Sequence, residues 1–252
     1  MIDNWRDYKS WISDATMAGV QFYYRGQRKL DWKLQTSFHR VASKSNITLI
    51  DYLDKIIPEV QYHSCAALNE IIDVSNEQQF GTFLAKLQHH GFPTPLLDWT
   101  LSPYIAAYFA FREIDPHNPD TDKVSIYVFD INEWHETFQQ HINLRQSPLF
   151  VGGFRPFAKD NPRMARQQAV TTATNIPDLG EYLNDKGKDV NKTFLYHVTL
   201  PLSERRLIMN ELNLMGINSI TMFPDFDGVC SSMKEMFFNN VEISLPSPEI
   251  TI

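Results

Sequence analysis

The sequence contains few cysteines, no long apolar run and no excess of positive charge, and each absence excludes a class of protein. Cys65 and Cys230 are the only cysteines among 252 residues, too few for a disulfide-stapled secreted domain. No run of roughly 18 apolar residues occurs, so we expect no membrane-spanning helix. The first residues, Met1 to Asp7, lack the apolar segment of a signal peptide. We therefore expect a cytoplasmic protein with no membrane partner.

The charge balance argues against a long nucleic-acid track, and the motif content argues against a zinc site. The formal net charge is −7 and the sequence pI is about 5.6, whereas phosphate-backbone binding leaves a basic footprint. Neither C-x-x-C nor H-E-x-x-H is present, so we expect no metal ligands. With 43% hydrophobic residues, the chain can bury one core, and we expect a single domain over residues 1–252.

Hydrophobic periodicity predicts loosely alternating helices and strands. Helices are expected over residues 3–18, 47–72, 76–90, from 103 onward and over 203–215. Strands are expected over 20–26, just before Asp98, over 124–131, 168–173, 194–200 and 217–223, with a further strand in the tail 236–252. Residues 142–162 and 174–192 are expected to form long loops. Because the spacing is irregular, we expect an α+β domain rather than a doubly wound sheet.

The first segment with polar residues suited to chemistry is Tyr24-Arg25-Gly26-Gln27, at the end of an aromatic strand. The planar fork of Arg25 can hold a phosphate or a carboxylate. Gly26 would allow a ligand to approach the backbone. A plain turn with a surface arginine remains an alternative for this segment.

The second segment runs from His89 to Thr100 and combines a helix end, a loop and a short apolar strand. Asp98 and Trp99 end that strand; a buried carboxylate would need a partner, for which Arg25 is a candidate. Trp99 or Tyr104 could stack on a nucleobase. The alternative is structural: Asp98 would cap the helix after Ser102, and Trp99 would belong to the core.

Two later segments carry weaker signals. Gln167 and Gln168, which follow Arg163 and Arg166, lead into a strand and can recognise an amide or a hydroxyl. Asp225 and Asp227 lie on a tight turn, where a carboxylate can cap a helix, bind a cation or pair with an arginine. A helix cap is the favoured interpretation for at least one of these two acids.

Together the four segments resemble the FRG domain family over about residues 20–230. The aromatic-Arg-Gly motif is Tyr24-Arg25-Gly26, and residues 88–110 are similar to the second hallmark. Residues 163–172 and 222–228 are similar to the third and fourth. Ala169 stands where the resemblance leads us to expect glycine, and Pro95 where a basic residue is usual.

The order of these motifs also resembles that of ADP-ribosyltransferases of the Arg–Ser-Thr-Ser–Glu type. That resemblance implies a split, mixed β-sheet with flanking helices, with NAD as co-substrate. In it Arg25 matches the arginine that holds the NAD phosphates, and residues 97–100 match the second strand. Gln167 and Gln168 fall near the position of the catalytic glutamate, where this chain has no glutamate.

The site that this resemblance implies has three sets of residues. The catalytic candidates are Arg25, Asp98, Gln168 and Asp227. The NAD-binding candidates are Tyr24, Arg25, Gly26, Gln27, His90, Gly91, Thr94, Trp99, Thr100 and Tyr104. The substrate-binding candidates are His89, Arg166, Gln167 and Asp225.

Three functions remain open at this stage. The first is an ADP-ribosyltransferase-like enzyme that modifies RNA, DNA or protein; the family context implies a bacterial toxin in phage defence or a toxin–antitoxin pair, with an antitoxin or chaperone as a further partner. The second is a non-catalytic nucleotide-binding sensor, which the missing glutamate favours. The third is a metal-dependent nuclease built from the histidines and aspartates.

Overall fold

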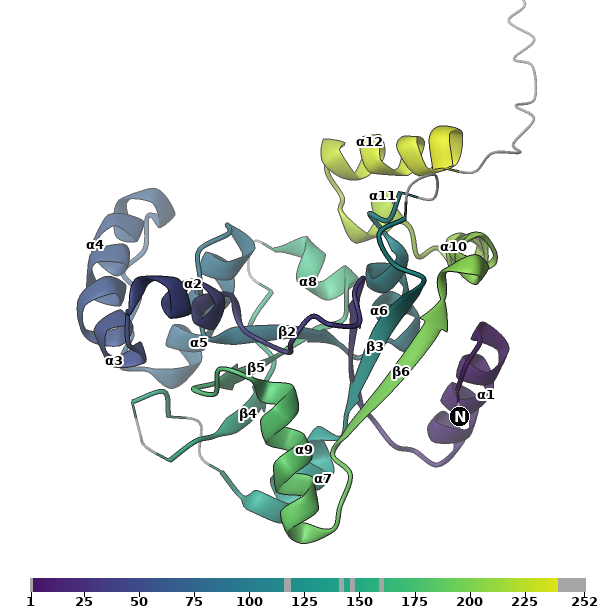
Figure 1. The fold of residues 1–252 in the computed structure, drawn as a ribbon. Coiled ribbons are helices and arrows are strands. Elements are labelled where there is room, and N and C mark those ends of the chain that lie inside the picture. Colours follow the sequence, from purple (N-terminus) through teal and green to yellow (C-terminus); the bar gives the residue numbers. More distant parts are fainter. Residues whose placement is uncertain (1, 116–118, 141–142, 146–147, 159–160, 240–252) are drawn as a thin grey trace, which may run out of the picture.

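A six-stranded open sheet in the order β4-β5-β2-β1-β3-β6 forms the centre of the computed structural model (Figure 1). The structure describes residues 2–115, 119–140, 143–145, 148–158 and 161–239. The strands are β1 (Tyr23–Gln27), β2 (Leu96–Thr100), β3 (Lys123–Phe129), β4 (Val151–Phe154), β5 (Ala169–Thr174) and β6 (Leu195–Pro201). The α+β class expected from the sequence is confirmed.

The sheet is antiparallel at every pairing of these strands, so the expected mixed sheet is wrong. It is nevertheless weakly joined at its centre. β1 and β2 share one paired position, Tyr24 with Thr100, whereas β1 pairs with β3 over five positions and β2 with β5 over five. The two halves of the sheet therefore diverge on either side of this single pairing.

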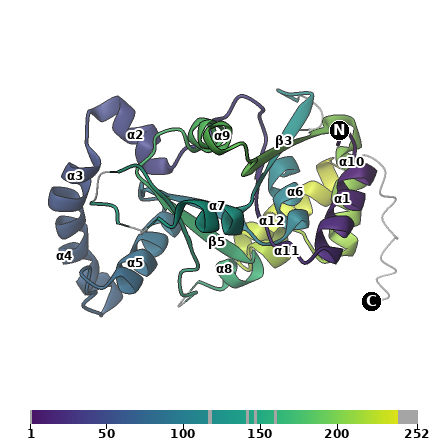
Figure 2. The ribbon, with the colours of Figure 1, turned by 90° about the horizontal axis from the view of Figure 1, so that it is seen from below.

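The helices gather at the two ends of the sheet and on both its faces. They are α1 (Trp5–Met17), α2 (Ser37–Ser45), α3 (Leu49–Asp51), η1 (Tyr52–Ile56), α4 (Ile57–Leu68), α5 (Glu77–His89), α6 (Pro103–Phe111), α7 (Ile131–Phe138), α8 (Pro162–Arg166), α9 (Leu179–Val190), η2 (Leu202–Glu204), α10 (Arg205–Leu214), α11 (Ser219–Met222), α12 (Phe226–Lys234) and η3 (Glu235–Asn239). Helices α2 to α5 lie at one end and α1 and α10 at the other (Figures 1 and 2). Figure 2 shows α8 and α9 on opposite sides of the sheet.

The core consists of three clusters that follow this arrangement. One packs α6 against β1, β3, α1 and α10, and includes Tyr24 and Ala106. A second lies under α7 and α9 and includes Leu97 and Trp99 of β2. The third joins α2, η1 and α5 to the other half of the sheet through Leu96. Because side chains alternate along a strand, Asp98 and Thr100 face away from the second cluster.

Most predicted elements are confirmed within a few residues. The structure has helices at 5–17 and 77–89, and the strands at 96–100, 123–129 and 195–201. Ser102 caps α6 by accepting a hydrogen bond from the Ile105 N–H, and Pro103 occupies the first turn. Gly91 adopts a φ of +82° just after α5, which agrees with a glycine ending that helix.

Three predictions of local structure are wrong. Residues 179–190, expected as a loop, form α9, whose Leu179, Leu183 and Gly187 are buried one turn apart. Residues 217–223, expected as a strand, contain α11, which begins with a capping box between Asn218 and Thr221. The loop expected over 142–162 contains β4. The helix expected over 203–215 is confirmed but starts slightly later: residues 202–204 form the turn η2, and α10 begins at Arg205.

None of the helices in the described part of the chain has the length and apolar character needed to cross a membrane. Both cysteines are free thiols. The strand expected within 236–252 falls mostly on residues 240–252, outside the described residues.

Candidate functional site

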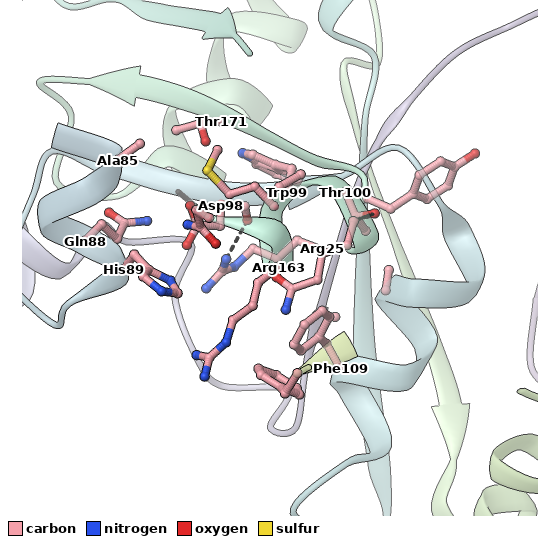
Figure 3. A pocket seen from close by; sticks show the side chains of 18 residues that line it. Arg25, Ala85, Gln88, His89, Asp98, Trp99, Thr100, Phe109, Arg163 and Thr171 are labelled. Atoms are coloured by element: carbon pink, nitrogen blue, oxygen red, sulfur yellow. Dashed lines mark hydrogen bonds between the residues drawn. The ribbon is translucent and has the colours of Figure 1, made fainter. Parts of the chain in front are cut away.

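A pocket of about 310 Å³ opens where β1 and β2 diverge. Its floor comes from β1, β2 and β5, and its walls from α5, α6 and α8 (Figure 3). Its lining residues are Tyr24, Arg25, Gly26, Ala85, Gln88, His89, Asp98, Trp99, Thr100, Ala106, Phe109, Asn161, Arg163, Met164, Gln167, Ala169, Thr171 and Phe223. The pocket therefore gathers residues from the first three sequence segments, together with Phe223 from the fourth.

Arg25 bridges the two diverging strands. Its Nη1 donates a hydrogen bond of 2.6 Å to the backbone carbonyl of Asp98 (Figure 3). Its Nε is buried and has no hydrogen-bond partner. Burial lowers the pKa of the Arg25 guanidinium and the charge of Asp98 opposes that shift, but an arginine stays protonated at neutral pH. A buried donor without a partner is costly, and an anionic ligand would satisfy it.

Asp98 is the only acidic residue among the described residues that line the pocket. Its side chain is exposed to the pocket, although neighbouring protein groups reduce its hydration. This desolvation raises the pKa of its carboxyl group, while Arg25, Gln88 and His89 act in the opposite direction. The expected partnership of Arg25 with Asp98 thus exists, but the hydrogen bond goes to the backbone carbonyl and the carboxylate interacts through charge.

Tyr24, Gly26 and Thr100 hold the centre of the sheet together. Tyr24 pairs with Thr100 and is buried, which raises the pKa of its phenol to about 12. A Cβ atom at Gly26 would overlap the carbonyl oxygen of Ala106 and lie 2.7 Å from the Ala110 nitrogen. Gly26 therefore allows the backbone of α6 to pack closely against β1, in addition to leaving room for a ligand.

Trp99 is a core residue, in agreement with the structural alternative. Its side chain is 3% exposed, and its indole Nε1 donates to Thr172 Oγ1 at 3.0 Å on the face below α7 and α9. The aromatic rings suited to stacking in the pocket are instead those of Phe109 and Phe223, which pack edge to face. Asp98 does not cap α6, because Ser102 does so.

The two glutamines before β5 are held in different ways. Gln167 lines the pocket; its carbonyl accepts from Thr100 Oγ1 at 2.7 Å, and its Nε2 donates to the Met222 carbonyl at 3.0 Å. Gln168 has a positive φ of 46° and an exposed side chain that does not line the pocket. Its carbonyl accepts from the Leu101 N–H, which fixes the start of β5 against β2.

The acids of the fourth segment lie outside the pocket. Asp225 caps α12 by accepting from the Gly228 N–H at 2.9 Å and pairs with Arg163, which lowers the pKa of its carboxyl group. Asp227 is exposed in the first turn of α12. Arg166 reaches the Thr221 carbonyl and does not line the pocket. The cap interpretation is confirmed for Asp225.

The remaining candidates separate into lining and supporting residues. His89 lines the pocket, and desolvation lowers its pKa. Thr94 is fully buried and does not line the pocket; its hydroxyl donates to Gln88 Oε1 and so fixes the side chain of a lining residue. Four others are absent from the lining: Gln27, His90, Gly91 and Tyr104, the last of which packs against Trp5.

Gln88, Phe109 and Asn161 are among the lining residues that the sequence analysis missed. Gln88 immediately precedes the candidate His89 on α5, so the sequence could have indicated that Gln88 lies near the site. Phe109 follows the helical spacing of α6 and was assigned to the core. Asn161 carried no signal, because the segment around it was read as a surface loop.

Residues 20–119 match the family model of the FRG domain. Over these residues the chain is similar to the FRG domain family. The match contains Tyr24-Arg25-Gly26 and residues 88–110, and so includes β1, β2, α5 and α6, which contribute to the pocket. Residues 163–172 and 222–228 lie beyond it, and their similarity to the third and fourth FRG motifs stays a prediction. No curated protein and no solved structure matches the chain.

Proposed function

We propose that the pocket binds NAD and that the chain transfers the ADP-ribose group to a macromolecular acceptor. The observation that carries the proposal is the placement of the motif segments. Arg25 and Asp98 come from β1 and β2, and Gln167 from the turn just before β5, the next strand in the sheet; all three line one pocket. This is the order in which the transferase resemblance uses its phosphate-binding, second-strand and catalytic segments.

Arg25 is suited to the diphosphate of NAD. One of its N–H groups is used by the Asp98 carbonyl and its Nε has no protein partner, so donors remain for phosphate oxygens. Arg163 adds a second guanidinium to the lining, although it also pairs with Asp225. Two arginines facing one pocket favour an anion despite the net charge of −7 on the whole chain.

Asp98 supplies the charge that the missing glutamate would have supplied. In the transfer, the bond between the ribose anomeric carbon and the nicotinamide nitrogen breaks, and nicotinamide leaves with the bonding electron pair. The Asp98 carboxylate stabilises the positive charge that develops on the ribose. The acceptor nucleophile then bonds to the anomeric carbon and releases its proton to a base. The raised pKa of Asp98 makes its carboxylate a better base for that proton.

A non-catalytic nucleotide sensor is the second candidate, and one observation favours it. The amide of Gln167, at the start of β5, cannot become negatively charged, and its Nε2 is used by the Met222 carbonyl. In that case Arg25 would bind the nucleotide and the glycosidic bond would stay intact. A metal-dependent nuclease has less support, since the described residues form no group of three or more His, Cys, Asp or Glu side chains placed to hold a metal ion.

Nicotinamide release distinguishes the two candidates. The purified chain is incubated with NAD labelled in its adenylate phosphate and with a bacterial lysate; free nicotinamide and label in protein, RNA and DNA are measured. We expect release by the parent and a loss of about 100-fold or more in Asp98→Asn. Arg6→Ala and Asp14→Asn, both on the exposed face of α1, are the matched controls and should keep the parent rate.

One outcome would contradict the transferase proposal, and another would contradict the role given to Asp98. Binding of NAD without release would assign the chain to the sensor class. Release that Asp98→Asn leaves unchanged would remove Asp98 from the chemistry. The toxin role adds one further expectation, that expression of the parent arrests bacterial growth while expression of Asp98→Asn does not.

A further inference from the structure

A second cavity of about 430 Å³ adjoins the pocket across a shared wall. His89, Asn161 and Met164 line both cavities. The second cavity lies between α5, the end of α4 and the residues Phe157, Ala158, Asn161 and Met164. A ligand that fills the first pocket can therefore continue past this wall without leaving the protein surface.

The second cavity differs from the first in its chemistry. Its lining is mostly apolar and includes Leu68, Ile72, Phe83 and Phe157. Two charged residues also line it, Glu70 and Lys86, and neither is without a partner. Desolvation lowers the pKa of His89, which favours its neutral form. The cavity thus suits an uncharged, flat or apolar group rather than a phosphate.

Asn161 provides a specific polar contact in this wall. It is 8% exposed and its Oδ1 is buried without a hydrogen-bond partner. Asparagine at the N-cap of a helix normally accepts a bond from the helix backbone, but Asn161, at the N-cap of α8, does not. A buried acceptor without a partner is costly in a folded protein. A ligand that carries an N–H donor would satisfy it.

We infer that the second cavity holds the adenine ring of NAD, with the 6-amino group donating to Asn161 Oδ1. The inference rests on the proposed function, in which the bond between the ribose and nicotinamide breaks beside Asp98. Asp98 lines the first pocket and not the second, so the nicotinamide half belongs in the first pocket. The diphosphate then meets Arg25 and Arg163, and the adenosine half continues into the second cavity.

The test compares the affinities of NAD, ADP-ribose and nicotinamide mononucleotide for the parent and three variants by calorimetry and competition. Ala158→Trp places a large ring at an exposed position that lines the second cavity. Ala165→Trp is the matched control, since Ala165 is exposed on α8 and lines neither cavity. Asn161→Ala removes the acceptor without removing a helix cap.

We expect Ala158→Trp to weaken the binding of NAD and ADP-ribose at least tenfold and to change the affinity for nicotinamide mononucleotide by no more than about twofold. Asn161→Ala should weaken the same two ligands by about five- to tenfold, and Ala165→Trp should change none. Equal weakening of all three ligands, or no change in any, would overturn the adenine assignment while leaving NAD binding intact. Failure of the parent to bind NAD would instead overturn the proposed function, and the adenine assignment with it.

Discussion

At the scale of the residue, the site depends on polar groups whose bonding capacity is only partly used inside the protein. Arg25 joins β1 to β2 through the Asp98 carbonyl, and its Nε is buried without a partner. Asn161 leaves its Oδ1 unused at the adjoining wall. Groups of this kind are rare in folded proteins because each one costs free energy. Their presence together at one pocket supports the proposal that the pocket binds a ligand.

Asp98 provides a test of this cost. Desolvation raises the pKa of its carboxyl group above the ordinary 3.8, so the folded state disfavours the ionised form. A raised folded-state pKa of an acid contributes stability at low pH that is lost as the pH rises through that value. We therefore expect Asp98→Asn to raise the melting temperature at pH 8, measured by calorimetry. The gain should fall to nothing well below pH 3.8, where the carboxyl group is protonated in both the folded and the unfolded parent.

The control for this prediction is Asp14→Asn on the exposed face of α1, which should leave the melting temperature unchanged at both pH values. A loss of stability in Asp98→Asn at pH 8 would show that the attraction of Asp98 to Arg25 outweighs desolvation.

How far the sequence predicted single residues depends on the kind of contact. Arg25, Asp98 and Gln167 were identified from residue type and position, and all three line the pocket. Trp99 was proposed for stacking but is buried in the core, because its position in β2 points it at the face covered by α7 and α9. The position of Asn161 in the site was not predictable, because it depends on the absence of the hydrogen bond by which an N-cap asparagine normally caps its helix.

At the scale of the element, the contact between β1 and α6 fixes the floor of the pocket. Gly26 lies directly against the backbone of Ala106 and Ala110, where no side chain has room. We expect Gly26→Ala to reduce the free energy of unfolding by about 3 kcal/mol, because α6 would have to move away from the sheet. Urea denaturation measures the change.

Gly180→Ala is the matched control for that substitution. Gly180 lies in the first turn of α9, and a Cβ atom there meets nothing nearer than 3.7 Å. Alanine in a helix should leave stability unchanged or raise it by roughly 0.5–1 kcal/mol. If Gly26→Ala were as well tolerated as Gly180→Ala, the close packing of β1 on α6 would not be required.

Elements were predicted well where burial and turn signals agreed, and poorly where polar composition hid a buried face. In α9 the polar residues dominate, but Leu179 and Leu183 recur at helical spacing and Asp178 caps the first turn. In α11 the apolar run of residues 217–223 suggested a strand, whereas the capping box at Asn218 starts a helix. The capping residues were present in both segments, and hydrophobic content alone was misleading.

At the scale of the whole molecule, the pocket exists because the sheet separates between β1 and β2. Their single paired position leaves the strands free to diverge, and α5, α6 and α8 close the sides. The sequence indicated an α+β domain, but the all-antiparallel pairing depends on long-range contacts that local patterns do not encode. The position of the second cavity also depends on long-range contacts, since its lining combines α4 and α5 with Phe157, Ala158 and Asn161.

The central claim is that the Arg25 pocket binds NAD through its diphosphate, and calorimetric titration of NAD into the parent and Arg25→Ala tests it most directly. A charge-assisted hydrogen bond to a phosphate contributes about 1.5–3 kcal/mol, so Arg25→Ala should weaken binding by roughly ten- to a hundredfold or more. Arg6→Ala, at an exposed position of α1, should bind as the parent does. Equal affinity of NAD for the parent and Arg25→Ala, or no binding to either, would contradict the account.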